Sequence, residues 1–196
     1  MVFGVTETLR AELRDLVETR AVKVGEFVLT SGRRSDYYVD GKQVTLHGRG
    51  AFLVASLVLQ RCRMHDARAV GGLTLGADPI AGAVAALSGA GDAQVSAFIV
   101  RKEAKSHGTA RTIEGPALRP AERVILVDDT LTTGGTLLTA AEAVRAEGAD
   151  VVEAVCVVDR EEGGAEALAA AGIPLYALFR RSDFPAARAT LPTRPS

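Results

Sequence analysis

Residues 124–136 read VILVDDTLTTGGT, and this stretch decides the fold. The run from Val124 to Val127 is short and continuously apolar, which predicts a strand buried on both faces of a parallel sheet. A turn rich in hydroxyls and glycines follows, and residues 137–147 have the composition of a helix. The first N–H groups of a helix are unpaired and its dipole is positive there, so the turn is a candidate phosphate site.

Two carboxylates between the strand and the turn indicate which phosphate compound fits. Asp128 and Asp129 would repel a bare anion, but carboxylates accept strong hydrogen bonds from sugar hydroxyls. The stretch therefore favours a ligand such as a ribose 5-phosphate. Because adjacent side chains of an ideal strand point to opposite faces, we expect the pair not to share one proton as an acid–base dyad.

Two other phosphate-binding motifs are excluded by the sequence. A P-loop needs G-x-x-x-x-G-K-[ST], and the pair Gly41-Lys42 lacks the earlier glycine. A dinucleotide site needs G-x-G-x-x-G, and the start at Gly89 meets Gln94 at the position of the third glycine.

Outward from this stretch, strand patterns alternate with helix patterns. We expect helices at residues 6–19, 49–63, 78–88, 137–147 and 165–171, strands at 69–73, 95–100, 124–127, 151–158 and 175–179, and a hairpin-like segment at 27–39 interrupted at Ser31-Gly32. This alternation predicts an α/β fold, a doubly wound parallel sheet with flanking helices. Such sheets bind ligands at the carboxyl ends of their strands, which is where Arg101, Asp128 and Arg160 are expected.

Composition bounds the class of protein. The 196 residues are 47% hydrophobic and 24% charged with a net charge of −1, so no global field favours nucleic acid. No apolar run reaches the ~18 residues of a membrane span, so we expect no membrane partner. Cys62 and Cys156 are far apart and lack metal-site spacing, which is typical of buried thiols in a reducing cytoplasm.

Four segments together resemble one family. Residues 124–136 are similar to the phosphoribosyl pyrophosphate (PRPP) motif of type I phosphoribosyltransferases. RKEAKSHG at 101–108 resembles the catalytic loop of the orotate phosphoribosyltransferases, FVLTSGRRSDYYVD at 27–40 their N-terminal substrate segment, and VDREEGG at 158–164 the strand end with their orotate-binding arginine. The match runs from about Val5 to Leu178.

This resemblance implies an architecture and a reaction. It implies the type I phosphoribosyltransferase fold as a single domain over residues 1–185, with a small N-terminal hood at about 1–45 and a C-terminal tail at 186–196. The implied activity is that of a Mg-dependent pentosyltransferase. It would transfer the 5-phosphoribosyl group from PRPP to orotate, giving orotidine 5′-monophosphate and pyrophosphate in the synthesis of UMP.

The resemblance also assigns roles to residues. The implied catalytic residues are Lys105, His107, Asp128 and Asp129. The implied PRPP-binding residues are Arg101, Lys102, Lys105, His107, Asp128, Asp129, Thr130, Leu131, Thr132, Thr133, Gly134, Gly135 and Thr136. The implied orotate-binding residues are Thr132 and Arg160, with the backbone around Tyr38 and Val39.

Partners follow from the same resemblance. The implied cofactor is Mg²⁺, held through PRPP and water with no direct side-chain ligand. The implied assembly is a cytoplasmic homodimer whose catalytic loops reach across the interface. The chain departs from many family members at Thr30, where they carry a substrate-contacting lysine. Either Arg33 or Arg34 compensates, or the contact is dispensable. Residues 74–78, TLGAD, also lack a lysine that some members carry.

Overall fold

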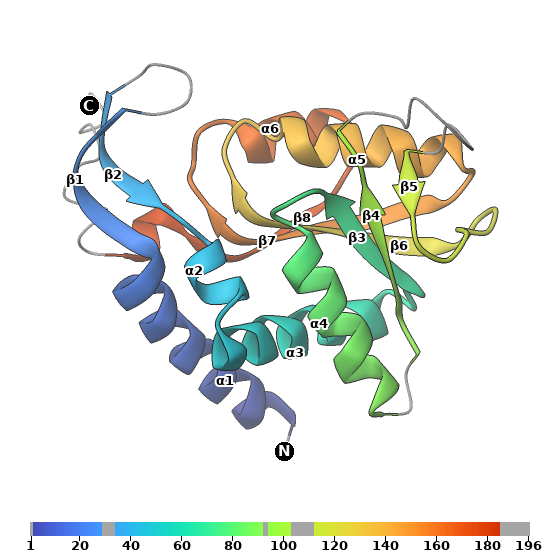
Figure 1. Ribbon diagram of the computed structural model, residues 1–196, viewed down its shortest axis with the longest axis horizontal. Coiled ribbons are helices and arrows are strands. Elements are labelled where there is room, and N and C mark those ends of the chain that lie inside the picture. Colours follow the sequence, from blue (N-terminus) through green and yellow to red (C-terminus); the bar gives the residue numbers. More distant parts are fainter. Residues whose placement is uncertain (1, 29–33, 92–93, 103–111, 185–196) are drawn as a thin grey trace.

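A parallel sheet lies between two layers of helices, and a separate hairpin stands beside it (Figure 1). The computed structural model describes residues 2–28, 34–91, 94–102 and 112–184. The expected interruption at Ser31-Gly32, the loop residues Lys105 and His107 and the tail 186–196 lie outside these ranges. Across the described residues, no helix combines the length and the apolar character needed to cross a bilayer.

The elements follow one another in the order expected from the sequence. The strands are β1 Val22–Val28, β2 Arg34–Val39, β3 Ala69–Leu73, β4 Ser96–Val100, β5 Ile113–Glu114, β6 Arg123–Leu131, β7 Asp150–Asp159 and β8 Leu175–Arg180. The helices are α1 Val2–Leu16, α2 Lys42–Thr45, α3 Gly48–Met64, α4 Asp78–Gly89, α5 Gly135–Ala146 and α6 Gly164–Ala170, with a π-helical turn η1 Val17–Ala21 and a 3₁₀ turn η2 Arg181–Asp183.

The six-stranded sheet has the order β5-β4-β3-β6-β7-β8. The pairs β4–β3, β3–β6, β6–β7 and β7–β8 are parallel, and β5 joins the edge antiparallel. From β3 the chain adds β4 and β5 on one side, and it then returns to the centre and adds β6, β7 and β8 on the other side. This confirms the doubly wound parallel sheet.

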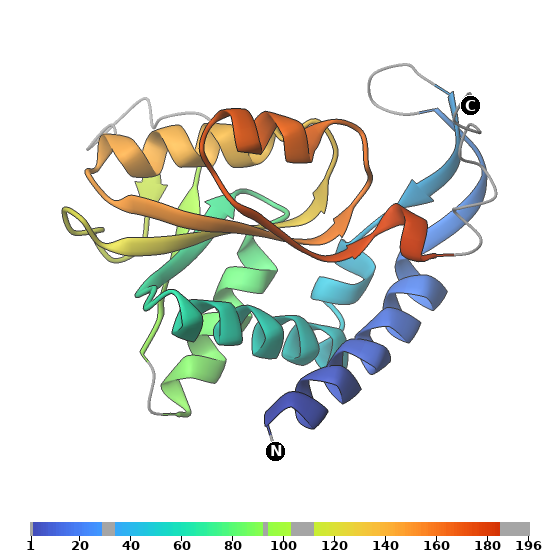
Figure 2. The same ribbon diagram turned by 180° about the vertical axis from the view of Figure 1, so that it is seen from behind.

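Strand β6 is buried on both faces, as its apolar run predicts. Ile125 and Val127 belong to the apolar core shared with α1, α3 and α4. Val124 and Leu126 belong to a second core shared with α5 and α6. All four side chains are inaccessible to solvent, and Figure 2 shows the two helical layers on opposite faces of the sheet. The centre of the sheet is therefore a rigid platform for whatever follows β6.

The N-terminal hairpin forms its own two-stranded sheet. Strand β1 pairs antiparallel with β2, and the register shifts between Val24 and Phe27. The hairpin projects beside the ends of β7 and β8, and β2 leads through Asp40 and Gly41 into α2 (Figures 1 and 2). This placement brings an N-terminal segment next to the edge of the central sheet.

Three local features differ from the sequence-based expectation. Strand β6 continues through Leu131 and does not end at Val127, because the polar residues still pair with β7. The short strand β5 was not expected; two residues carry too little periodicity to predict it. The pair Asp78-Pro79 predicts Asp78 as the N-cap of α4, but the N-cap is Ala77 and Asp78 is the first helical residue. Asp78 accepts a hydrogen bond from Thr74 Oγ1 at 2.7 Å.

Candidate active site

The acidic pair lies on the last part of β6 and is buried. Asp128 is 6% and Asp129 4% exposed, and Asp128 stands opposite Cys156 in the register with β7. Each carboxylate has polar partners, as a buried carboxylate must. Asp128 accepts hydrogen bonds from Thr136 Oγ1 at 2.6 Å and from the backbone N–H of Asp129 at 2.9 Å.

The two carboxylates lie on opposite faces of β6, as expected, because Asp128 contacts Thr136 of α5 while Asp129 contacts Lys42 of α2. Both Oδ1 atoms face Gly76, in the loop that follows β3. A β-carbon at Gly76 would overlap Asp128 Oδ1 and would approach Asp129 Oδ1 to 2.6 Å. Alternation along β6 is thus kept, and the two Oδ1 atoms converge beside Gly76 at the end of the strand.

This convergence changes the protonation of the pair. Burial raises the pKa of Asp128 to about 7, and the negative charge of Asp129 raises it further, while the hydrogen bond from Thr136 opposes the rise. At neutral pH the two carboxylates thus carry less than two full negative charges. That the pair does not share one proton as a dyad stays a prediction.

The turn after β6 leads directly into a helix N-terminus. Gly134 has a left-handed backbone with φ of +86° and is the N-cap of α5, which a glycine accommodates without strain. No side chain caps this helix end. Gly164 packs under the turn, since a β-carbon there would lie 2.6 Å from the carbonyl oxygen of Thr132. The arrangement leaves an uncapped helix end beside the acidic pair, which suits a phosphate.

The thirteen-residue stretch is not uniformly accessible. Thr133, Gly135 and Thr136 are exposed and Thr132 is half-buried. The side chain of Leu131 is completely buried in the core, and its carbonyl accepts a hydrogen bond from the backbone N–H of Arg160 at 2.9 Å. Only backbone atoms of Leu131 are left for a ligand. The hydrogen bond ties the ends of β6 and β7 together, so Arg160 is fixed relative to the turn.

Arg160 is held in a buried cluster with Tyr37 and Glu162. Its Nε donates to the Tyr37 hydroxyl at 3.2 Å, and its Nη2 lies 2.7 Å from Glu162 Oε1 in an ion pair. The Tyr37 hydroxyl donates to the same Glu162 oxygen at 3.0 Å. Burial raises the pKa of Tyr37, and the cation of Arg160 opposes this. The hairpin thereby contacts the end of β7.

The two tyrosines of the hairpin have different surroundings. Tyr37 is 3% exposed, whereas Tyr38 is half-buried and packs on Phe27 with ring centroids 5.6 Å apart. Alternation along a strand predicts that only one of Tyr37 and Tyr38 faces inward, and the structure confirms it. Val39 is buried, so its side chain belongs to the core. Tyr37, not singled out as a site residue, is the one that contacts Arg160.

Lys42 is a second site residue that the sequence did not reveal. Its Nζ lies 3.1 Å from Asp129 Oδ2 and 3.2 Å from Asp40 Oδ1. In the sequence, the pair Gly41-Lys42 resembles only an incomplete P-loop. A single lysine between polar residues forms no recognisable motif. Lys42 and Asp129 are 87 positions apart in the sequence, and only the fold brings them into contact.

The predicted basic loop is described only in part. Arg101 is half-buried and forms an ion pair with Glu114 at 3.2 Å, and Lys102 is exposed. Both follow β4, at the same edge of the sheet as the acidic pair. Lys105 and His107 lie outside the described residues.

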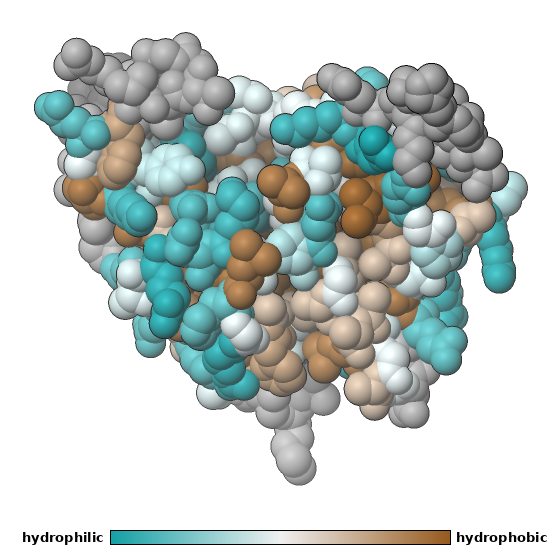
Figure 3. Space-filling model, in the orientation of Figure 1, coloured by the Kyte–Doolittle hydropathy of each residue, from teal (hydrophilic) through white to brown (hydrophobic). Residues whose placement is uncertain are grey.

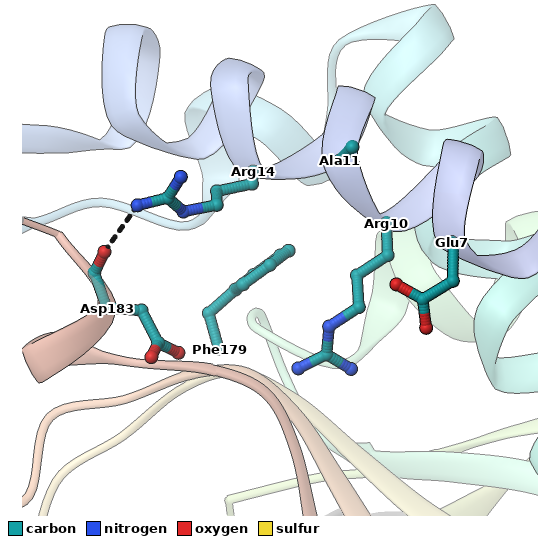
Figure 4. A pocket seen from close by; sticks show the side chains of 6 residues that line it. All are labelled: Glu7, Arg10, Ala11, Arg14, Phe179 and Asp183. Carbon is teal, nitrogen blue, oxygen red and sulfur yellow. Dashed lines mark hydrogen bonds between the residues drawn. The ribbon is translucent and has the colours of Figure 1, made fainter.

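A cavity of 460 Å³ lies elsewhere, between α1 and the end of β8 (Figure 4). Its two arginines are already engaged. Arg14 donates to the carbonyl oxygen of Asp183 at 2.8 Å, and Arg10 donates to the Tyr176 hydroxyl at 3.1 Å and stacks over Phe179 at 5.2 Å. None of its lining residues belongs to β6, its turn or the Arg160 cluster. The cavity reflects packing of α1 on the sheet.

Known proteins resemble the chain over almost its whole length. The model of the phosphoribosyl transferase domain matches residues 40–171. The orotate phosphoribosyltransferase of Corynebacterium glutamicum is 47% identical over 180 residues, which cover 92% of this chain and 96% of that protein. The counterpart from Thermosynechococcus vestitus is 48% identical over 178 residues, covering 91% and 94%.

A solved structure agrees with these sequence comparisons. The orotate phosphoribosyltransferase of Mycobacterium tuberculosis in complex with PRPP matches with a TM-score of 0.74 and 40% identity, over 89% of this chain and 98% of that one.

Proposed function

The chain belongs to the orotate phosphoribosyltransferase family, and from this premise we propose that it transfers the 5-phosphoribosyl group of PRPP to orotate. The products are orotidine 5′-monophosphate and pyrophosphate, and the step belongs to the synthesis of UMP. One observation carries the proposal: a converging carboxylate pair, Asp128 and Asp129, stands at the end of β6 directly before the uncapped N-terminus of α5.

The ribose 5-phosphate fits this edge of the sheet. The N–H groups of the turn from Thr132 to Thr136 are placed to receive the 5′-phosphate, where the helix dipole is favourable. Asp128 and Asp129 accept hydrogen bonds from the ribose hydroxyls. Thr130 adds a hydroxyl next to Asp129, 3.4 Å from its Oδ1. The same carboxylates oppose a bare phosphate, so they select a sugar phosphate.

The orotate carboxylate fits Arg160. A guanidinium binds a carboxylate at two points through its planar fork. Arg160 is positioned by Tyr37 and by the backbone hydrogen bond to Leu131, and its partner Glu162 shows that a carboxylate is accommodated there. Thr132 and the backbone at Tyr38 and Val39 complete the base side of the proposed site.

The departing pyrophosphate is assigned to the basic loop. As the bond to pyrophosphate breaks, positive charge builds on the ribose and negative charge on the leaving group. Arg101, Lys102, Lys105 and His107 provide cations that stabilise this negative charge. Exclusion of water by the loop protects the reactive sugar from hydrolysis. The backbone around Leu75 and Gly76, next to the acidic pair, is a further candidate contact for the diphosphate.

Mg²⁺ is proposed as the cofactor, bound through the diphosphate oxygens and water. When bound, it neutralises charge on the leaving diphosphate. The ammonium of Lys42 already lies 3.1 Å from Asp129 Oδ2. A carboxylate that is paired with one cation in this way is better suited to accept hydrogen bonds from hydroxyls than to bind a second cation. Among the described residues, no group of three or more His, Cys, Asp or Glu side chains is arranged to hold a metal.

A homodimer with a shared catalytic loop is part of the proposal. Leu46 and Leu75 are 70% and 71% exposed, and they lie before α3 and α4. Figure 3 shows apolar side chains gathered over α4 on the same face of the molecule. Exposed apolar patches of this kind mark protein–protein contacts. The buried free thiols of Cys62 and Cys156 suit the reducing cytoplasm, where we place the enzyme.

One assay tests the function. The purified protein is incubated with PRPP, Mg²⁺ and orotate, and in parallel with adenine or hypoxanthine in place of orotate. We expect release of pyrophosphate and formation of a nucleotide with orotate alone. Turnover with a purine base would overturn the orotate assignment, and PRPP binding without turnover on any base would indicate a non-catalytic PRPP sensor.

A further inference from the structure

Lys42 and Gly41 lie directly against Asp129. The ammonium of Lys42 is 3.1 Å from Asp129 Oδ2, although α2 and β6 are far apart in the sequence. A β-carbon at Gly41 would lie 2.8 Å from the Cβ of Asp129 and 3.0 Å from its carbonyl oxygen. The backbone before α2 thus packs directly against Asp129. This backbone contact, and not only the flexible side chain of Lys42, places the ammonium beside the carboxylate.

The two acids have unlike partners. Asp128 accepts hydrogen bonds from neutral donors, Thr136 Oγ1 and a backbone N–H. Asp129 faces a cation, and its side chain is 5% exposed while that of Lys42 is 40% exposed. Two buried carboxylates in contact cannot both ionise freely, and a cation beside one of them decides which one keeps the charge.

Among the residues that the structure describes, Lys42 of α2 and Asp40 just before α2 are charged neighbours of the pair. Helix α5 contributes the hydroxyl of Thr136, and the loop after β3 contributes Gly76. Burial lowers the pKa of Lys42, but attraction to Asp129 and Asp40 raises it above its ordinary value. The lysine therefore remains protonated over the whole range in which the acids titrate.

We propose that Lys42 is a positioning residue for the transfer reaction: its ammonium keeps the Asp129 carboxylate ionised and oriented toward the ribose hydroxyls. The inference rests on the proposed function, because it needs the acidic pair to bind the ribose of PRPP. Lys42 lies three residues after Val39, so the segment that borders the base also sets the charge of the ribose-binding pair.

The test compares Lys42→Met, which removes the charge and keeps the aliphatic stem, with Lys42→Arg, which keeps the charge. In Lys42→Met we expect the KM for PRPP to rise about tenfold, because the Asp129 carboxylate loses the contact that orients it, and tenfold corresponds to ~1.4 kcal/mol of binding. The acidic limb of kcat/KM for PRPP should move to higher pH by about one unit. The KM for orotate should change little. Lys42→Arg should retain the wild-type pH profile.

Arg63→Met is the matched control, since it removes an exposed cation at the far end of α3. A wild-type acidic limb and PRPP KM in Lys42→Met would overturn the proposal, as would a Lys42→Arg variant that is equally impaired. Wild-type protein inactive on orotate would instead refute the proposed function.

A second measurement needs no substituted lysine. In the wild-type protein labelled with ¹³C at aspartate carboxyls, Asp129 should ionise at lower pH than Asp128. Asp128→Asn and Asp129→Asn serve only to assign the two signals. The reverse order of ionisation would overturn the proposal even if Lys42→Met failed to fold.

Discussion

Gly76 and Asp128 are packed so closely that a β-carbon on Gly76 would overlap the carboxylate oxygen Oδ1. Gly76→Ala should therefore displace the acidic pair while leaving the cores untouched. A misplacement of this kind costs roughly 100-fold in rate when it moves groups that hold the reacting substrate. We expect kcat/KM for PRPP to fall by about that factor, measured by the rate of pyrophosphate release.

Gly82→Ala is the control for this substitution. Gly82 lies in α4, is exposed, and has no atom within 4 Å of the position of a new β-carbon. Alanine is favoured over glycine inside a helix by about 0.5–1 kcal/mol, so this variant should be slightly more stable and fully active. Equal activity of Gly76→Ala and Gly82→Ala would show that the acids tolerate displacement.

The raised pKa of Asp128 predicts a stability that depends on pH. A carboxyl with a pKa of about 7 in the folded state and about 4 in the unfolded state holds a proton on folding between those values. The free energy of unfolding then falls as pH rises from about 4 to 7. Asp128→Asn removes this loss. The stability gained by the substitution in the unliganded protein should therefore be larger at pH 8 than at pH 5, by about 2–3 kcal/mol.

Urea unfolding of the wild type and of Asp128→Asn at both pH values measures this difference. Asp150→Asn, an exposed acid at the start of β7, is the control. A difference between wild type and Asp128→Asn that stays constant with pH would contradict the shifted pKa. The variant should at the same time lose activity, because the carboxylate that is costly to bury is the one proposed to bind ribose.

The sequence predicted the elements that depend on local pattern. The run from Val124 to Val127, the strand at 69–73 and the uncapped turn before α5 follow from apolar periodicity and glycine placement, and the structure has them. The convergence of Asp128 and Asp129 was not predictable, because it depends on Gly76 from another loop. Lys42 was missed for the same reason: its contact joins segments that only the folded sheet brings together.

The ion pair of Arg61 and Glu153 anchors α3 to β7 in a nearly dry environment. Arg61 Nε donates to Glu153 Oε2 at 2.8 Å, and the two side chains are 18% and 5% exposed. Arg61→Met leaves a buried carboxylate without its guanidinium, which should lower the free energy of unfolding by about 3–5 kcal/mol. Thermal or urea unfolding measures the loss.

The pair of Arg49 and Glu12 is the control, since its side chains are 49% and 41% exposed. Arg49→Met should barely change the melting temperature, because exposed ion pairs are screened by water and salt. A similar loss of stability in Arg61→Met and Arg49→Met would mean that the burial of Glu153 does not determine how much its unpaired carboxylate destabilises the protein.

Lys105→Ala tests the role of the basic loop in the proposed reaction. If this cation acts mainly on charge that develops as pyrophosphate leaves, kcat should fall by about 100- to 1,000-fold with little change in the KM for orotate. Steady-state kinetics with both substrates varied measures the two effects separately. Near-normal turnover would exclude Lys105 from the transition state.

Glu162 forms an ion pair with Arg160, whose guanidinium is proposed to bind the orotate carboxylate. Its Oε1 lies 2.7 Å from Arg160 Nη2 and accepts the hydroxyl of Tyr37 at 3.0 Å. Orotate must compete with this internal carboxylate, so a neutral side chain of the same shape should ease binding. Glu162→Gln keeps an oxygen acceptor for Tyr37 and removes the competing charge. We expect the KM for orotate to fall, by up to about tenfold, the factor that ~1.4 kcal/mol represents, with the KM for PRPP unchanged. Glu166→Gln, an exposed acid in the first turn of α6, is the control. A rise in the KM for orotate would show instead that Glu162 orients Arg160 for its substrate.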